Sequence, residues 1–170
     1  AVTGDDTGTT VTLPWTFPFF NLTRTTFYFS TNSHLSAAAY NTWTNTWATF
    51  TGNNAPNGMI APMWCDTMTG NVTPPNSGLY TYTANGGAAN ERMIFYSRNN
   101  RYNKTTDIYQ HQAVLYQRGD IALRYEYLSS GALFEDGQPT DNGLNDTIHH
   151  TCGITRNNGA DYFWTTPLTV

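Results

Sequence analysis

Two acidic segments carry the side chains best suited to holding a metal ion. One is Gly4-Asp5-Asp6-Thr7-Gly8, and the other combines Glu135-Asp136-Gly137 with Asp141-Asn142. Calcium needs only oxygen ligands, which carboxylates and loop carbonyls supply. Acidic turns are also common without an ion, and we favour that interpretation. Calcium is therefore the one cofactor we consider, and no other is expected.

Zinc-type donors cluster in His149-His150-Thr151-Cys152. On a strand, neighbouring side chains point to opposite faces, so His149 and His150 cannot bind one ion without a bulge. If Cys152 is oxidised, the cluster also loses its thiolate. We therefore expect no zinc site.

Catalytic constellations are weak in this chain. A glycosidase needs two carboxylates facing across a groove, and the candidates are Glu91, Glu126, Glu135 and Asp136. No Gly-x-Ser-x-Gly motif occurs, and Lys104, the sole lysine, is not preceded by a serine at the Ser-x-x-Lys spacing. We predict that the protein is not an enzyme.

The composition is typical of an extracellular β protein. Of the 170 residues, 39% are hydrophobic and only 12% charged, about half the usual share. Thr and Asn supply the polar surface, and they favour strands and turns. A net charge of −4 without a basic patch argues against nucleic-acid binding. No apolar run is long enough for membrane insertion.

The start at Ala1 fits a matured secreted chain or a piece of a longer one. Two cysteines, Cys65 and Cys152, are either buried thiols or one disulfide. The composition favours the disulfide, because such bonds persist in extracellular proteins. It would join the middle of the chain to its last third. We therefore expect an extracellular or cell-surface location.

Strand patterns recur along the chain. In the clearest one, Ile121, Leu123, Tyr125 and Tyr127 alternate with polar or small residues, the period of a half-buried strand. Together with the preceding apolar run it predicts a long hairpin over 107–127. Its turn contains Arg118-Gly119-Asp120, an integrin-type tripeptide that we interpret as turn geometry, since a tight hairpin favours Gly.

Further strands are predicted between turn signals, and one short helix is possible at 36–46. The segment 15–20 follows Pro14 and is interrupted by Pro18, which favours a sheet edge. We predict one domain over residues 1–170, an all-β, two-layer antiparallel β-sandwich of jelly-roll type. It has about ten strands and at most one short helix. The other strands are expected at 9–13, 25–30, 59–64, 79–83, 92–97, 148–155 and 161–165.

Surface sites complete the predictions. Acceptor motifs for N-glycosylation begin at Asn21, Asn71, Asn103 and Asn145, a number that chance alone explains in an Asn-rich chain. Trp43 and Trp47 stand four residues apart and form either a buried stripe or a platform for sugar rings.

The order of several motifs resembles the nidogen-like β-sandwich modules of secreted and surface proteins. The motifs are the run 27–32 before Leu35-Ser36, the run 55–64, Gly78-Leu79-Tyr80 and the hairpin centre 113–121. The chain departs from such modules at two places. Ser33 stands where they have Gly, and of the two acidic residues that often follow the Trp only Asp66 is present, because the first position is Cys65. The resemblance implies a non-enzymatic extracellular module.

The leading functional hypothesis is a structural or adhesive surface protein, such as a filament or matrix subunit. Its partners would be other copies of itself or other surface and matrix proteins. The strand-like ends of the chain suit such assembly, because a strand can add to an exposed sheet edge. The alternative is a lectin-like module that binds glycans through Trp43 and Trp47.

Overall fold

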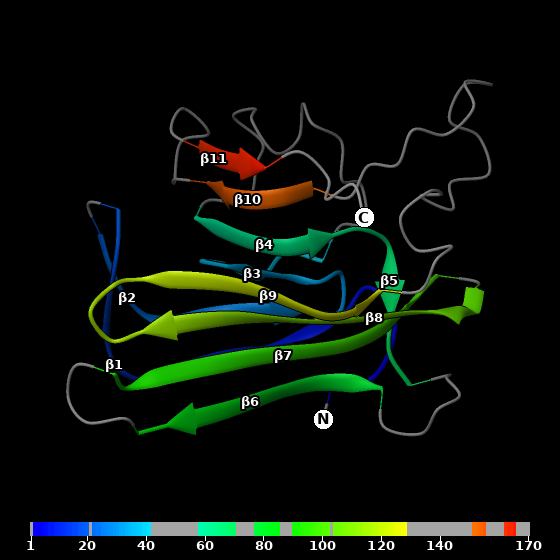
Figure 1. The fold of residues 1–170 in the computed structure, drawn as a ribbon, viewed down its shortest axis with the longest axis horizontal. Coiled ribbons are helices and arrows are strands. Elements are labelled where there is room, and N and C mark those ends of the chain that lie inside the picture. Colours follow the sequence, from blue (N-terminus) through cyan, green and yellow to red (C-terminus); the bar gives the residue numbers. More distant parts are fainter. Residues whose placement is uncertain are drawn as a thin grey trace.

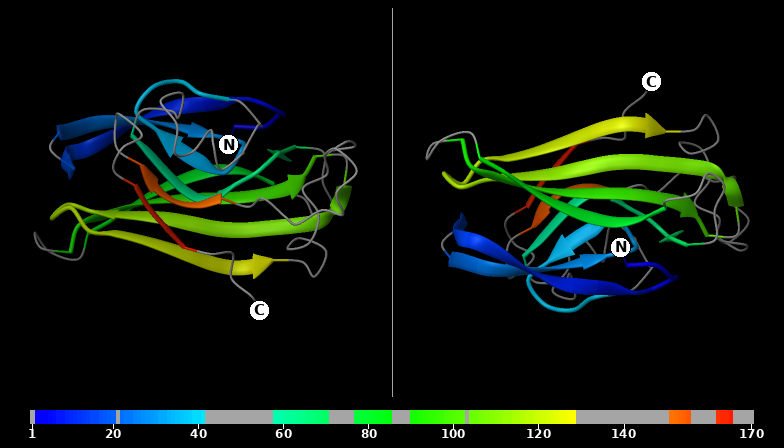
Figure 2. Two further views of the ribbon diagram at one scale, coloured as in Figure 1. Left: turned by 90° about the horizontal axis from the view of Figure 1, so that it is seen from above. Right: turned by 90° about the horizontal axis from the view of Figure 1, so that it is seen from below.

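The protein is a two-layer β-sandwich. The computed structural model describes residues 2–20, 22–41, 58–70, 77–85, 90–102, 104–128, 151–155 and 162–165. These residues form eleven strands in two sheets whose strand pairs are all antiparallel. The sheets lie one over the other (Figure 2), so the predicted fold class is confirmed.

The first sheet has six strands, in the order β1-β2-β3-β4-β10-β11. It contains the predicted strand pair near the C-terminus, in which Thr155 pairs with Tyr162. Its strands are β1 (Gly8–Phe19), β2 (Leu22–Ser30), β3 (His34–Ser36), β4 (Met59–Trp64), β10 (Thr151–Thr155) and β11 (Tyr162–Thr165).

The second sheet has five strands, in the order β5-β7-β8-β9, and β6 also pairs with β7 (Figure 1). The β8–β9 hairpin is the one that the sequence predicts, and β8 begins slightly earlier than expected. The strands are β5 (Thr67–Met68), β6 (Gly78–Ala84), β7 (Arg92–Arg101), β8 (Lys104–Tyr116) and β9 (Ile121–Leu128).

Strand β1 forms one border of the first sheet, as its prolines predict. Its pairing with β2 shifts register between Thr12 and Phe17, the segment that contains Pro14. Proline has no N–H to donate to a ladder, and an edge strand tolerates that loss. The two predicted strands on either side of Pro14 are therefore one continuous strand.

Aromatic side chains fill the space between the sheets. The rings of Phe17 and Phe27 lie 6.2 Å apart within the first sheet, and Phe29 meets Phe95 of the second sheet at 5.5 Å. Each such buried side chain contributes about 1.5–3 kcal/mol from apolar burial. Strand β7 shows the period of two, since Met93 and Phe95 are buried and Ile94 is not.

The helix considered at 36–46 is not formed in its described part. Ser36 ends β3, and residues 37–41 follow as bends and irregular chain, whereas 42–46 lie outside the described residues. The short Ala run therefore does not suffice to nucleate a helix here. Nucleation is unfavourable because the first turn fixes the backbone of three residues and gains only one hydrogen bond. Within the described ranges, no helix has the length and hydrophobicity to cross a membrane.

Candidate functional site

The turn between β2 and β3 is completely buried although its residues are polar. Thr31, Asn32 and Ser33 each have 0% exposed surface. Ser33 has a φ of 64°, the left-handed region that favours glycine. The Gly that the family resemblance implies at this position would adopt this φ without strain, whereas Ser33 does not. Its hydroxyl supplies contacts that a glycine lacks.

Asn99 of β7 and Thr67 of β5 satisfy this turn from the second sheet. The Asn99 Nδ2 donates to the Thr31 carbonyl at 2.7 Å and to the Ser33 Oγ at 2.8 Å. The Thr67 Oγ1 donates to the Thr31 carbonyl at 2.6 Å and lies 3.0 Å from the Ser33 Oγ. Ser97 completes the network by donating to the Asn99 Oδ1 at 2.5 Å. We call these residues, with Asn32, the buried polar network.

The network also holds the N-terminal segment. The Thr31 N–H donates to the Thr7 carbonyl at 2.7 Å, and the Thr7 N–H donates to the Thr31 Oγ1 at 3.0 Å. The Asn32 Nδ2 donates to the Asp6 Oδ1 at 2.7 Å. At the other end of the segment, Gly4 exchanges backbone hydrogen bonds with Thr69. Residues 4–7 are thus fixed between the two sheets.

Asp5, Asp6 and Asp66 form an acid triad at this end of the sandwich. Each offers a carboxylate oxygen, and these oxygens all lie within 4.8 Å of one another. Burial and repulsion by Asp5 and Asp6 raise the pKa of Asp66 to about 7, against a smaller lowering by Arg101. Burial, followed by the charge of Asp6, also raises the pKa of Asp5. The triad therefore carries unfavourable charge at neutral pH.

Three converging carboxylates are ligands of the kind that calcium prefers. Asp66 thus lies beside Asp5 and Asp6 of the first predicted acidic segment. In the sequence, Asp66 is notable only as the one acidic residue left of a pair. Because Asp6 and Asp66 are sixty positions apart in the sequence, only the fold brings them together. The favoured interpretation, acidic turns without an ion, stays a prediction beside the calcium alternative, and the second acidic segment, 135–142, lies outside the described residues.

His34 is another buried polar residue of this region. It has 0% exposed surface and packs between the rings of Tyr40 and Trp64, at 5.9 and 5.8 Å. Burial lowers its pKa to about 4, although the Asn32 and Tyr40 carbonyl oxygens beside its two ring nitrogens favour the charged form. His34 is therefore neutral at physiological pH, and its role in the described structure is to pack β3 against β4.

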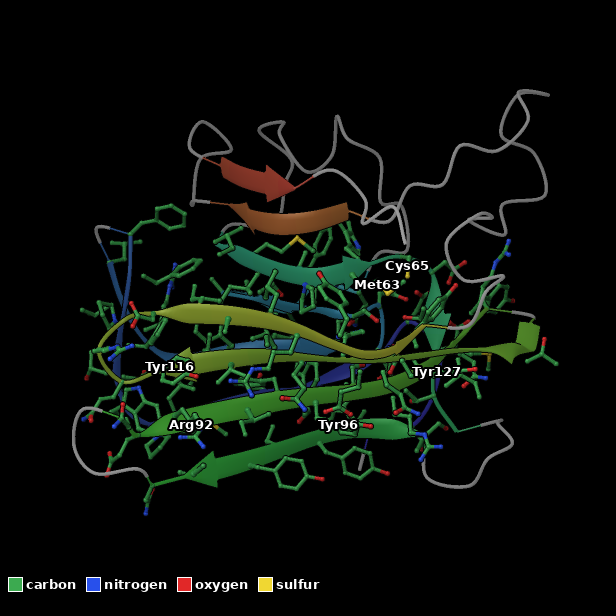
Figure 3. All side chains as sticks on the ribbon, in the orientation of Figure 1. Met63, Cys65, Arg92, Tyr96, Tyr116 and Tyr127 are labelled. Atoms are coloured by element: carbon green, nitrogen blue, oxygen red, sulfur yellow. The ribbon has the colours of Figure 1, made fainter. Side chains whose placement is uncertain are left out.

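The second sheet presents a face rich in tyrosine and arginine to the outside (Figure 3). Cross-strand pairing aligns its members, since Tyr80 lies opposite Tyr96, Tyr96 opposite Gln112, and Gln112 opposite Arg124. The Tyr80 and Tyr96 ring centroids are 6.1 Å apart. We call this surface the outer tyrosine face; it consists of Tyr80, Tyr82, Arg92, Tyr96, Arg98, Gln110, Gln112, Tyr116, Arg124, Glu126 and Tyr127.

The placement of Tyr127 corrects the sequence prediction. Tyr127 pairs with Gln110 and Tyr125 with His111, so Glu126 is an additional residue in β9. This bulge breaks the period of two. Tyr125 points inward and donates to the Pro62 carbonyl at 2.5 Å, whereas Tyr127 is 51% exposed on the outer face. Glu126 is exposed and accepts a hydrogen bond from Gln112, as expected for a solvated strand residue.

The Arg118-Gly119-Asp120 tripeptide forms the tip of the β8–β9 hairpin. Gly119 has a φ of 105°, and its N–H donates to the Tyr116 carbonyl at 2.8 Å. The side chains of Arg118 and Asp120 form an ion pair with each other. The structure therefore agrees with the interpretation of this tripeptide as turn geometry.

The two cysteines lie on neighbouring segments. Thr151 pairs with Trp64 and Gly153 with Ala61, so a bulge places the backbone of Cys152 opposite the 62–63 step. Cys65 directly follows β4 and is buried, and its Sγ lies 3.3 Å from the Met63 carbonyl oxygen (Figure 3). The middle of the chain and its last third are thus adjacent. The Cys152 side chain is outside the described part, so the disulfide stays a prediction.

Several predicted sites lie outside the described residues and stay predictions. They include the platform for sugar rings, the four glycosylation sites and the histidine pair before β10. The residues are Trp43, Trp47, Asn21, Asn71, Asn103, Asn145, His149 and His150.

Sequence reasoning missed the outer tyrosine face. Its signal was present, because tyrosines at alternate positions, such as Tyr80 and Tyr82, point to one face of a strand. The pairing of four strands was needed to show that these residues form one surface.

Comparison with known families supports the resemblance seen in the motifs. A family model described as NIDO related matches residues 1–168, nearly the whole chain. No curated protein and no solved structure matches this chain. The match agrees with the sandwich fold and indicates an extracellular, matrix-type module. The chain belongs to the NIDO-related family.

Proposed function

We propose that this protein is a non-enzymatic structural or adhesive module of the extracellular matrix or cell surface. It works by contact, through the outer tyrosine face, with other copies of itself or with other surface proteins. The single observation that carries the proposal is the composition of this face. Tyrosine and arginine dominate the binding energy of protein interfaces, and lysine is depleted there.

Four side chains of this face are hydrogen-bonded to one another in pairs. The Tyr96 hydroxyl donates to the Gln110 Oε1 at 3.4 Å, and the Arg124 Nη2 donates to the Tyr116 hydroxyl at 3.3 Å. Burial and the nearby Glu126 raise the pKa of Tyr96, which keeps its phenol protonated. Binding therefore costs less side-chain entropy than it would for free side chains.

Charge favours an acidic partner surface. The outer tyrosine face carries Arg92, Arg98 and Arg124 against Glu126, although the whole chain has a net charge of −4. A positive face on an acidic molecule orients an approaching partner and prevents many incorrect encounters.

The buried polar side chains support the rigid body that carries this face. Asn99, Thr67 and Ser33 hydrogen-bond to one another and to the turn, and they have 0% exposed surface. Such groups stabilise the fold.

Attachment of protein-coated microspheres tests the proposal. Microspheres should adhere to a layer of the same protein or to decellularised matrix. The double variant Tyr96→Ala, Arg124→Glu should reduce attachment about tenfold, which is the effect of losing one interface hot spot. The control is Tyr102→Ala, a 39% exposed tyrosine in the β7–β8 turn. Attachment no better than that of uncoated microspheres, or equal loss in the control, would refute the proposal.

A further inference from the structure

The edges of the two sheets differ in how well they are protected. An exposed edge strand can pair with another chain, and proteins usually prevent this with proline, charge or bulges. In the described residues, β1 contains Pro14 and Pro18, and β9 has a bulge with the exposed charges of Arg124 and Glu126. Strand β11 is only four residues long.

Strand β6 has none of these protections. Its sequence, Gly-Leu-Tyr-Thr-Tyr-Thr-Ala, contains neither charge nor proline, and it pairs with β7 without a register shift. Thr81, Tyr82 and Thr83 are exposed, Tyr82 to 52%. Figure 1 shows β6 as the lower border of the second sheet.

The backbone of β6 is oriented to accept a further strand. The Leu79 N–H donates to the Val2 carbonyl at 3.4 Å, so the polar groups of Leu79 point away from β7. Hydrogen-bonding direction alternates along an antiparallel strand. Thr81 and Thr83 therefore also direct their N–H and C=O groups toward the edge. The bridge from Val2 shows that extended chain fits there.

We propose that β6 pairs in antiparallel fashion with β6 of a second copy, about a two-fold axis at Tyr82. This inference rests on the proposed function and names the surface through which copies join. Thr81 lies opposite Thr83 of the second copy, and the two residues exchange both backbone hydrogen bonds. The reciprocal pair does the same. The pairing is confined to residues 81–83, because the bridge from Val2 to Leu79 already occupies the edge beyond Tyr80.

A second copy fits this edge better than an unrelated strand because the pairing is self-complementary. The two β6 strands carry no like charges to oppose each other, and Thr–Thr and aromatic cross-strand pairs are favourable. At the axis, Tyr82 meets its own counterpart and joins the outer tyrosine faces of both copies. A two-fold contact of this kind closes on itself.

Sedimentation velocity over a concentration series tests the pairing. Wild type should form dimers, and Tyr82→Lys should weaken dimerisation by roughly tenfold, because two lysines then meet about 5 Å apart. The matched control is Tyr102→Lys, since Tyr102 is 39% exposed in the β7–β8 turn and lies outside the outer tyrosine face. Tyr102→Lys should leave the dimerisation constant unchanged.

Two further variants test the backbone contact. Thr81→Pro removes an N–H that points away from β7, so the fold is kept and the dimer lost, whereas Thr81→Val keeps the N–H and the dimer. Tyr82→Cys should form a disulfide-linked dimer on oxidation.

A wild type that stays monomeric at millimolar concentration, or equal effects of Tyr82→Lys and Tyr102→Lys, would overturn the inference. Microsphere attachment to matrix by monomeric Thr81→Pro, which leaves the outer tyrosine face unaltered, would show that the proposed function survives such a failure.

Discussion

Substitutions of Ser33 separate two contributions to the stability of the buried β2–β3 turn, the backbone strain and the hydrogen bonds of the side chain. Its φ of 64° is costly for any residue with a Cβ, by about 1–2 kcal/mol. Against this, the Ser33 hydroxyl takes part in hydrogen bonds with Thr67 and Asn99, at 3.0 and 2.8 Å. Ser33→Ala removes the hydrogen bonds and keeps the strain. Ser33→Gly removes both.

The magnitudes predict an order of stability. Two buried hydrogen bonds contribute about 0.5–1.5 kcal/mol each, so Ser33→Ala should destabilise the fold by about 2 kcal/mol. In Ser33→Gly, the relief of strain exceeds the entropy that glycine adds to the unfolded chain, about 0.4–1 kcal/mol. We therefore expect Ser33→Gly to cost only about 1 kcal/mol.

Urea unfolding followed by tryptophan fluorescence measures the difference, because the midpoint reports stability when the slope is unchanged. Ser36 provides the control. It is also fully buried, and its hydroxyl donates to the Ala38 carbonyl at 2.7 Å, but it lies in β3. There glycine should be worse than alanine. If Ser33→Gly is as destabilising as Ser33→Ala, the turn is not strained and the reasoning is wrong.

Three other predictions concern the acid triad, the cysteines and the hairpin tip. Since the pKa of Asp66 is raised from 3.8 to about 7 in the folded state, stability should fall as pH rises between these values. Asp66→Asn should reduce this fall; identical pH profiles would contradict the prediction. Non-reducing mass spectrometry should find Cys65 linked to Cys152, and alkylation of both in the unreduced, unfolded protein would exclude the bond. Gly119→Ala should cost about 1–3 kcal/mol in urea unfolding, because its φ is 105° and a Cβ would lie 2.8 Å from the Pro18 side chain; an unchanged midpoint would show that this contact relaxes freely.

Local patterns were enough to predict most strands. Alternation over 92–97 and 121–125, and the prolines at positions 14 and 18, report properties of a strand that do not depend on its neighbours. The bulge at Glu126 was not predictable in this way. It depends on how β9 pairs with β8, and one additional residue moves Tyr127 to the other face.

The sequence by itself determined that the chain forms antiparallel strands with polar turns, and its ordered motifs indicated the family. Only the tertiary structure decided that Asp66 joins Asp5 and Asp6, and that the tyrosines of four strands share one face. The physical reason is that strand periodicity is encoded within a few residues. Which distant side chains become neighbours depends on strand order and register, and these are set by the packing of the whole sandwich.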